Sequence, residues 1–200
     1  MTKLIIKGGK KLHGSVRIAG MKNAATPILA ACLLATKKCV ISNVPDIADV
    51  RVMMDILRDL GTGVSYEKHT VTISPGPIAK IKRKELVNKL RSSILVLGPL
   101  LARQKEVSLP EPGGCIIGKR PIDTHLFALE KLGAKISHNN GNINLRAKKL
   151  KGAEIILPEF SVTATENLIM AASLAQGKTI IKLAAIEPHV QDMIKFLNKM

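Results

Sequence analysis

An internal repeat constrains the fold of this chain more than any other feature of its sequence. The ten residues from Ile56 (ILRDLGTGVS) align with the ten from Ala128 (ALEKLGAKIS), 72 positions later, and the pattern begins a third time at Phe196 (FLNKM). Self-similarity at a nearly fixed spacing indicates one structural unit that is used several times. We therefore expect three similar units, the third of them truncated.

Similar helix and strand patterns recur within each unit. The first element is expected to be a helix of small apolar residues, over residues 24–35, 92–103 and 166–176. Short strands are expected next, over residues 39–42, 107–109 and 179–182. A second set of helices, with apolar residues at helical spacing, is expected over residues 47–60, 122–132 and 190–199. Helices that alternate with strands in this way indicate an α/β fold.

Turn sequences complete this outline. Gly61 and Gly133 follow two of the second helices, where a glycine commonly ends a helix. Asn140-Gly141 indicates the turn of a hairpin that begins at Lys135. Residues 74–77 (SPGP) indicate the boundary between the first and second units.

The composition excludes several classes of protein. Apolar residues make up 46% of the chain, which is enough to form a core and argues against disorder. The net charge is +16, yet aromatic residues make up only 2%. Proteins that bind single-stranded nucleic acid stack bases on aromatic rings, so the charge favours a small phosphate-bearing ligand at least as much as a polynucleotide. The longest apolar runs, 28–35 and 94–102, are too short to span a membrane, and no membrane association is expected.

The cysteines divide into two kinds. Their odd number and the absence of paired spacing argue against a disulfide framework or a structural zinc site, and favour a reducing cytoplasm. Cys32 and Cys39 lie in apolar segments and are expected in the core. Cys115 follows Gly113-Gly114 and precedes Lys119-Arg120, where a positive field favours a thiolate or holds an anion beside the thiol. The simpler alternative for Cys115 is a small buried apolar residue.

Three expected helix starts carry polar or cationic groups. Lys22-Asn23 opens the first helix, Arg91-Ser92-Ser93 opens the second, and residues 161–167 (SVTATEN) lead into the third. The N-terminus of a helix favours anions. Equivalent positions converge if the units are related by a pseudo-threefold axis, so the pattern predicts an anion site. Each start alone is also compatible with an ordinary helix cap and a surface cation.

Taken in order, these segments resemble the enolpyruvyl transferase family, and among its members those that act on UDP-N-acetylglucosamine. The resemblance runs from about Leu4 to Met200 and includes MKNAA (21–25), LGPLLAR (97–103), PGGC (112–115), RPID (120–123), SVTATEN (161–167) and EP (187–188). It implies that family's fold, an inside-out α/β barrel of two domains, each with three βαβαββ units and pseudo-threefold symmetry.

The resemblance also implies a reaction and a set of residues. The enolpyruvyl group of phosphoenolpyruvate moves to the 3′-hydroxyl of UDP-N-acetylglucosamine with release of phosphate, a step of peptidoglycan synthesis that needs no metal or organic cofactor. Cys115 matches the cysteine that donates a proton and that fosfomycin alkylates. Lys22, Asn23 and Arg120 match residues that hold phosphoenolpyruvate. The residues that match contacts to the UDP-sugar are Arg91, Arg120, Pro121, Ile122, Asp123, Thr124, Glu159, Phe160, Ser161 and Val162.

The chain departs from the family pattern in places. Thr124 stands where leucine is usual, Thr163 where glycine is usual, and His189 where glutamate is usual. Family members are also longer. Residues 1–21 are therefore expected to be a strand segment of a second, missing domain, and residues 22–200 a three-unit domain with a truncated third unit. A chain of this kind is expected to be an inactive N-terminal fragment.

Two other functions remain open at this point. One is a sister enolpyruvyl transferase of the shikimate pathway, which is not expected to carry the PGGC loop. The other is a non-catalytic basic domain that binds nucleic acid or a protein partner through residues 80–91. The steep salt dependence of polynucleotide binding would separate the second alternative from a small-ligand site.

Overall fold

The computed structural model describes residues 3–113 and 121–200 of the chain. The α-helices are α1 (Lys22–Ala31), α2 (Ala48–Asp59), α3 (Lys84–Lys89), α4 (Leu97–Gln104), α5 (Asp123–Lys131), α6 (Val162–Ala172) and α7 (Pro188–Lys199). The 3₁₀ helices are η1 (Cys32–Leu34) and η2 (Arg91–Val96). The strands are β1 (Cys39–Ile41), β2 (Gly63–Glu67), β3 (Thr70–Ser74), β4 (Glu106–Pro110), β5 (Lys135–Asn139), β6 (Asn142–Arg146), β7 (Glu154–Ile156) and β8 (Ile180–Lys182).

The repeat in the sequence corresponds to a repeat in the sheets. The first two sheets have the same strand order, β1-β3-β2 and β4-β6-β5, and all of their neighbouring strands are antiparallel. The third sheet pairs β7 with β8 in parallel, on either side of α6 in the sequence. The expected α/β fold is therefore confirmed, and its first two units share one topology.

Several of the expected helices have different bounds, and two of these differences have clear local reasons. The helix expected over 92–103 is a 3₁₀ turn followed by α4, which begins two residues before Pro99. Proline lacks an N–H and is tolerated in the first turn of an α-helix, so α4 begins at a position that suits Pro99. The helix expected from residue 166 already begins at Val162, because the Ser161 hydroxyl caps it by accepting a hydrogen bond from the Ala164 N–H.

Each of the two hairpins turns through two residues with positive φ. Asn140 and Gly141 join β5 to β6, as expected from the sequence, with φ of 52° and 70°. Lys68 and His69 join β2 to β3 with φ of 46° and 60°, although lysine rarely adopts that conformation and histidine adopts it only somewhat more often than most residues do. Positive φ at both central positions matches the right-handed twist of the paired strands, which explains why the two turns agree while their sequences differ.

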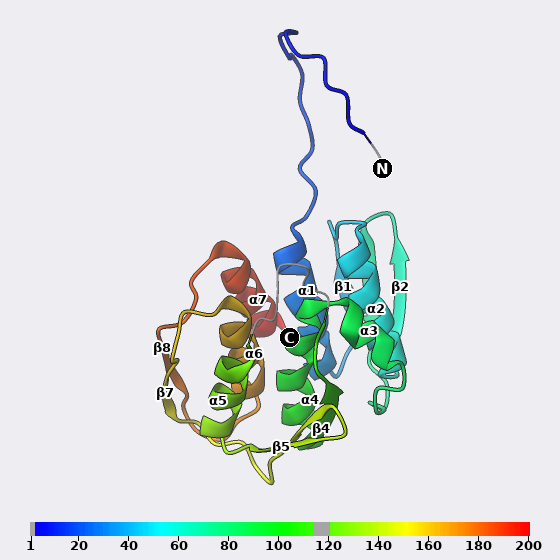
Figure 1. Cartoon of the computed structure of the whole chain (residues 1–200). Coiled ribbons are helices and arrows are strands. Elements are labelled where there is room, and N and C mark those ends of the chain that lie inside the picture. The colour runs from blue at the N-terminus through cyan, green and yellow to red at the C-terminus, as the bar shows by residue number, and fades with distance from the viewer. Residues whose placement is uncertain (1–2, 114–120) are drawn as a thin grey trace.

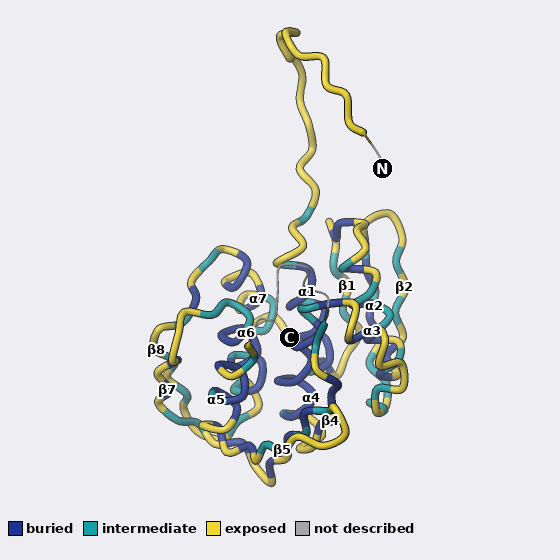
Figure 2. Tube along the Cα trace, in the orientation of Figure 1, coloured by how far each residue is buried: buried dark blue, intermediate teal, exposed yellow. Residues whose placement is uncertain are grey.

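The helices lie inside and the sheets outside. In Figure 1 the sheet that contains β1 and β2, the sheet that contains β4 and β5, and the pair β7 and β8 lie around α1, α4 and α6. Helix α4 packs on α6, and η2 contacts both α1 and α6. Helix α2 packs against α1, α5 packs against α6, and α7 packs against both α1 and α6. The buried residues of Figure 2 accordingly gather on the helices and on one face of the strands.

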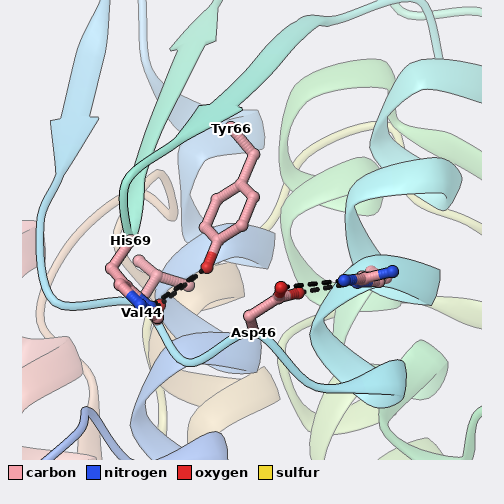
Figure 3. Close-up of polar contacts among 5 residues, drawn as sticks. Val44, Asp46, Tyr66 and His69 are labelled. Carbon is pink, nitrogen blue, oxygen red and sulfur yellow. Dashed lines mark hydrogen bonds and ion pairs between the residues drawn. The ribbon is translucent and has the colours of Figure 1, made fainter.

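A histidine and a tyrosine fix the loop between β1 and α2. The hydroxyl of Tyr66 donates to the backbone oxygen of Val44 at 3.2 Å, and Nδ1 of His69 lies 3.2 Å from the same oxygen (Figure 3). Asp46 accepts two hydrogen bonds from the guanidinium of Arg51, at 2.6 and 2.8 Å, and this lowers the pKa of the Asp46 carboxyl. These contacts set the position at which α2 begins.

An extended arm precedes α1. Six large apolar side chains of the arm are 76 to 94% exposed: Leu4, Ile5, Ile6, Leu12, Val16 and Ile18. Figure 1 shows the arm running away from the packed helices. No strand is assigned to residues 3–21, so the strand and the second domain expected for residues 1–21 stay a prediction. Among the described helices, none combines the length and the apolar character needed to cross a membrane.

Candidate functional site

One cavity of about 530 Å³ lies where the three helix starts meet. Its lining residues come from α1, from the start of α2, from the end of α3 and the adjoining η2, from α6, and from the start of α7. The expected convergence of the three helix starts is therefore observed. The lining residues are Lys22, Asn23, Thr26, Asp49, Lys89, Leu90, Arg91, Ser92, Leu95, Val162, Thr163, Glu166, Glu187 and His189.

Three cationic side chains line this cavity. Lys22 is held by Asp49, the first acidic residue of α2, with 2.8 Å between Nζ and Oδ2. Arg91 donates from Nη2 to the backbone oxygen of Pro121 at 3.0 Å. Lys89 ends α3, just before Arg91. The basic segment 80–91 therefore turns two of its cations toward the cavity, where they favour an anionic ligand.

Another part of the cavity lining is acidic and buried. Glu166 is only 2% exposed, and its Oε1 has no hydrogen-bond partner among the described residues. Oε2 of Glu187 and Nε2 of His189 are likewise buried without a partner in the described part of the chain. Burial raises the pKa of Glu166 to about 8, and the nearby charge of Glu187 contributes in the same direction. Glu166 therefore carries a proton at neutral pH in a large fraction of the molecules.

The two segments that were predicted to bind the UDP-sugar lie side by side. The Thr124 hydroxyl donates to Oε1 of Glu159 at 2.7 Å, which joins the start of α5 to the loop before α6. Ser161 caps α6, and Val162 lines the cavity. Phe160 is 56% exposed beside them. An exposed aromatic ring next to a helix N-terminus offers an apolar surface and a set of N–H groups together, which suits a nucleotide.

The remaining predicted residues fall into two groups. Pro121 and Asp123 are exposed, and Ile122 packs partly against the core. Cys115 and Arg120 lie outside the described residues, so the roles predicted for them remain predictions. Cys32 is buried as expected, while Cys39 is only partly buried against the core.

Ten of the fourteen lining residues were not among the site residues predicted from the sequence, and four of these ten are acidic residues or lysines: Asp49, Lys89, Glu166 and Glu187. A signal for Glu166 was available, because it is an acidic residue within an apolar helix, and such a residue needs a partner or a function. The sequence held no comparable signal for Asp49, which reaches Lys22 only through the packing of α2 on α1.

The sequence model of the family EPSP synthase (3-phosphoshikimate 1-carboxyvinyltransferase) matches residues 6–200. The chain belongs to this family.

Its fold is also that of solved enolpyruvyl transferases. The crystal structure of the enolpyruvyl transferase NikO from Streptomyces tendae superposes with a TM-score of 0.79 at 23% identity, over 96% of this chain and 45% of that one. EPSP synthase from Acinetobacter baumannii gives a TM-score of 0.70 at 20% identity, over 89% and 42% of the two chains.

Curated relatives of this EPSP synthase family member are more similar in sequence. Proteins named UDP-N-acetylglucosamine 1-carboxyvinyltransferase from Borrelia garinii subsp. bavariensis and Coxiella burnetii are 46% and 48% identical over all of this chain. The protein named UDP-N-acetylglucosamine 1-carboxyvinyltransferase 1 from Carboxydothermus hydrogenoformans is 49% identical. The chain spans 47 to 48% of the length of these relatives.

Proposed function

We propose that this chain is the N-terminal part of an enzyme that transfers the enolpyruvyl group of phosphoenolpyruvate to the 3′-hydroxyl of UDP-N-acetylglucosamine. The reaction releases phosphate and supplies peptidoglycan synthesis in the cytoplasm. The observation that carries the proposal is the cavity, which three helix starts and three cationic side chains line. Relatives that bear the name of this activity, at 46 to 49% identity, support the choice of substrates.

The chemistry explains why such a cavity is needed. The sugar hydroxyl adds to C2 of phosphoenolpyruvate while C3 takes a proton, which gives a tetrahedral ketal that then loses phosphate and a proton. An acid must donate a proton to C3, a base must accept the proton of the sugar hydroxyl, and cations must balance the charges of the carboxylate and phosphate. We assign the acid to Cys115, and the binding of phosphoenolpyruvate to Lys22, Asn23 and Arg120.

The nucleotide sugar is proposed to lie along the two segments that Thr124 and Glu159 join. Arg91 supports this placement, because its guanidinium contacts the backbone of Pro121 and also lines the cavity. The N-terminus of α6 suits the diphosphate. The proposed contacts are Arg91, Arg120, Pro121, Ile122, Asp123, Thr124, Glu159, Phe160, Ser161 and Val162.

The domain assignment is part of the proposal. Residues 22–200 form a three-unit domain with a truncated third unit, in an inside-out α/β barrel with pseudo-threefold symmetry. The shared strand order of the first two sheets and the inner position of the helices support this assignment. Residues 1–21 belong to a second domain, and the exposed apolar side chains of the arm support it, because they need a surface on which to pack.

The test is an assay of the protein extended by the open reading frame beyond Met200. We expect phosphate release from phosphoenolpyruvate that depends on UDP-N-acetylglucosamine. Shikimate 3-phosphate, offered as an alternative acceptor, should give no release. A folded, extended protein that releases no phosphate with UDP-N-acetylglucosamine contradicts the proposal, and release with shikimate 3-phosphate alone would favour the sister enzyme.

Cysteine variants test the assignment of the acid. Cys115→Ser should abolish both turnover and the covalent adduct with fosfomycin, as measured by mass spectrometry. Cys39→Ser is the matched control, because a hydrogen bond from Cys32 lowers the pKa of Cys39 to about 7 and makes it the more reactive of the two described thiols. An adduct that persists in Cys115→Ser and disappears in Cys39→Ser would overturn the assignment.

A further inference from the structure

A buried polar network begins at Asn167, in the middle of α6. Its Oδ1 accepts a hydrogen bond from the Gly98 N–H at 2.7 Å, and its Nδ2 donates to the backbone oxygen of Ile94 at 2.8 Å. A backbone N–H can only donate and a backbone carbonyl can only accept. These two backbone groups therefore determine which end of the Asn167 amide is oxygen and which is nitrogen.

The orientation of Asn167 determines the tautomer of His125. The Nδ2 group of Asn167 also lies 3.1 Å from Nδ1 of His125, and since Nδ2 carries only hydrogens, Nδ1 must accept. Burial lowers the pKa of His125 to about 3, and the charge of Arg91 contributes, so the ring is neutral at physiological pH. A neutral imidazole has one N–H. That proton is therefore on Nε2.

The tautomer of His125 in turn orients the hydroxyl of Thr163. Nε2 of His125 lies 3.1 Å from Oγ1 of Thr163, and because Nε2 carries the proton, Oγ1 is the acceptor. A hydroxyl that accepts still has one proton to donate. Within the described residues, His125 is the one hydrogen-bond partner of this hydroxyl, and Thr163 lines the cavity.

We propose that Thr163 is a specificity-determining residue whose hydroxyl donates a hydrogen bond to an anionic oxygen of the UDP-sugar diphosphate. The inference rests on the proposed function, because it takes the nucleotide sugar as the occupant of this part of the cavity. It concerns a position at which this chain carries a hydroxyl and the resemblance leads one to expect a glycine.

The surroundings of Thr163 favour an anionic acceptor. Thr163 is the second residue of α6, where backbone N–H groups are free of intrahelical partners. Arg91 and Lys89 line the same cavity. A phosphate oxygen only accepts hydrogen bonds, so it complements a hydroxyl that accepts from His125 and still has its proton to donate. The hydrogen-bond chain fixes the hydroxyl before the ligand arrives, which lowers the entropy lost on binding.

The experiment compares three variants of the extended protein. Thr163→Val removes the hydroxyl at nearly constant volume, and Thr163→Ser keeps it. We expect Thr163→Val to raise the KM and the Kd for UDP-N-acetylglucosamine about tenfold, the usual effect of losing a hydrogen bond to a charged group. The KM for phosphoenolpyruvate should stay within about twofold of wild type, and Thr163→Ser should restore both values.

Thr62→Val controls for the general cost of losing a buried threonine hydroxyl. Thr62 is buried after α2, donates to the Leu57 backbone oxygen at 2.8 Å, and does not line the cavity. We expect it to lower the melting temperature without changing either KM. If Thr163→Val changes only the melting temperature, the hydroxyl has a purely structural role and the inference is wrong.

A nuclear magnetic resonance measurement keeps the inference testable even if Thr163→Val does not fold. The ¹⁵N shifts of His125 in the wild-type protein should show a proton on Nε2 and no titration between pH 5 and 8. A proton on Nδ1 instead would overturn the inference. The wild-type protein could also carry the proton of His125 on Nε2 and yet not bind UDP-N-acetylglucosamine. That result would contradict the proposed function, and the inference about Thr163 would then be wrong as well.

Discussion

Glu166 makes the stability of this protein depend on pH in an unusual direction. The ordinary pKa of a glutamate is 4.5, and burial together with Glu187 raises that of Glu166 to about 8. Between these values the folded state holds a proton that the unfolded state has lost. The free energy of unfolding therefore falls as the pH rises from 4.5 to about 8, and it stays constant above that. Glu166→Gln, which cannot ionise, should remove this fall.

The magnitude follows from the interval between the two pKa values. At about 1.4 kcal/mol for each pH unit, the wild-type protein should lose up to about 5 kcal/mol across the interval. Because the side chain is 2% exposed, screening by solvent reduces this figure little. At pH 9 we expect Glu166→Gln to exceed wild type in stability by several kcal/mol, and at pH 4.5 the two proteins should be nearly equal.

The assay is urea denaturation at intervals from pH 4.5 to 9, with wild type, Glu166→Gln and Glu187→Gln in parallel. Glu187→Gln tests the contribution of the neighbouring charge. Removing that charge should move the midpoint of the fall in the free energy of unfolding to lower pH. Glu130→Gln controls for a solvent-exposed glutamate and should follow wild type. If the curves of wild type and Glu166→Gln run parallel over the whole range, Glu166 is ionised in the folded state and the reasoning fails.

Three further substitutions test other contacts. Asn167→Ala leaves the Gly98 N–H and two other buried groups without partners, and should cost about 3 kcal/mol in urea denaturation; a loss under about 1 kcal/mol contradicts the network. Asp49→Asn frees Lys22 from its ion pair, and should tighten phosphoenolpyruvate binding up to about fivefold in calorimetry; weaker binding would show that Asp49 helps to position Lys22. Tyr66→Phe removes one hydrogen bond and should cost about 1 kcal/mol in thermal denaturation; no change would assign the position of the loop to His69.

The fold could be predicted where the sequence repeats and where turns carry typical residues. The alignment of residues 56–65 with 128–137 predicted two units with the same succession of elements, and their sheets share one strand order. Asn140-Gly141 predicted its hairpin. The turn through Lys68 and His69 could not be predicted, because its conformation follows from the pairing of Glu67 with Thr70 rather than from the turn residues themselves.

The candidate site could likewise be predicted only in part from the sequence. Lys22, Asn23 and Arg91 could be found because each lies at a helix start of one repeated unit, and helix starts of equivalent units meet. The acidic wall could not be assembled from the sequence, since Glu166 and Glu187 approach each other only when α7 packs beside α6. The orientation of the Thr163 hydroxyl could not be predicted either, because it depends on a chain of hydrogen bonds through three helices.

The close approach of α4 and α6 has a consequence for how the chain folds. A Cβ atom built on Gly98 would lie 2.3 Å from the backbone oxygen of Asn167, so the two helices touch at a point where no side chain fits between them. The hairpins β2–β3 and β5–β6 involve neighbours in the chain, and such hairpins form within microseconds. Contacts between residues far apart in the chain form more slowly. We therefore expect the two hairpins to form early and the α4–α6 contact late, so that the cavity, which α6 lines, also takes shape late in folding.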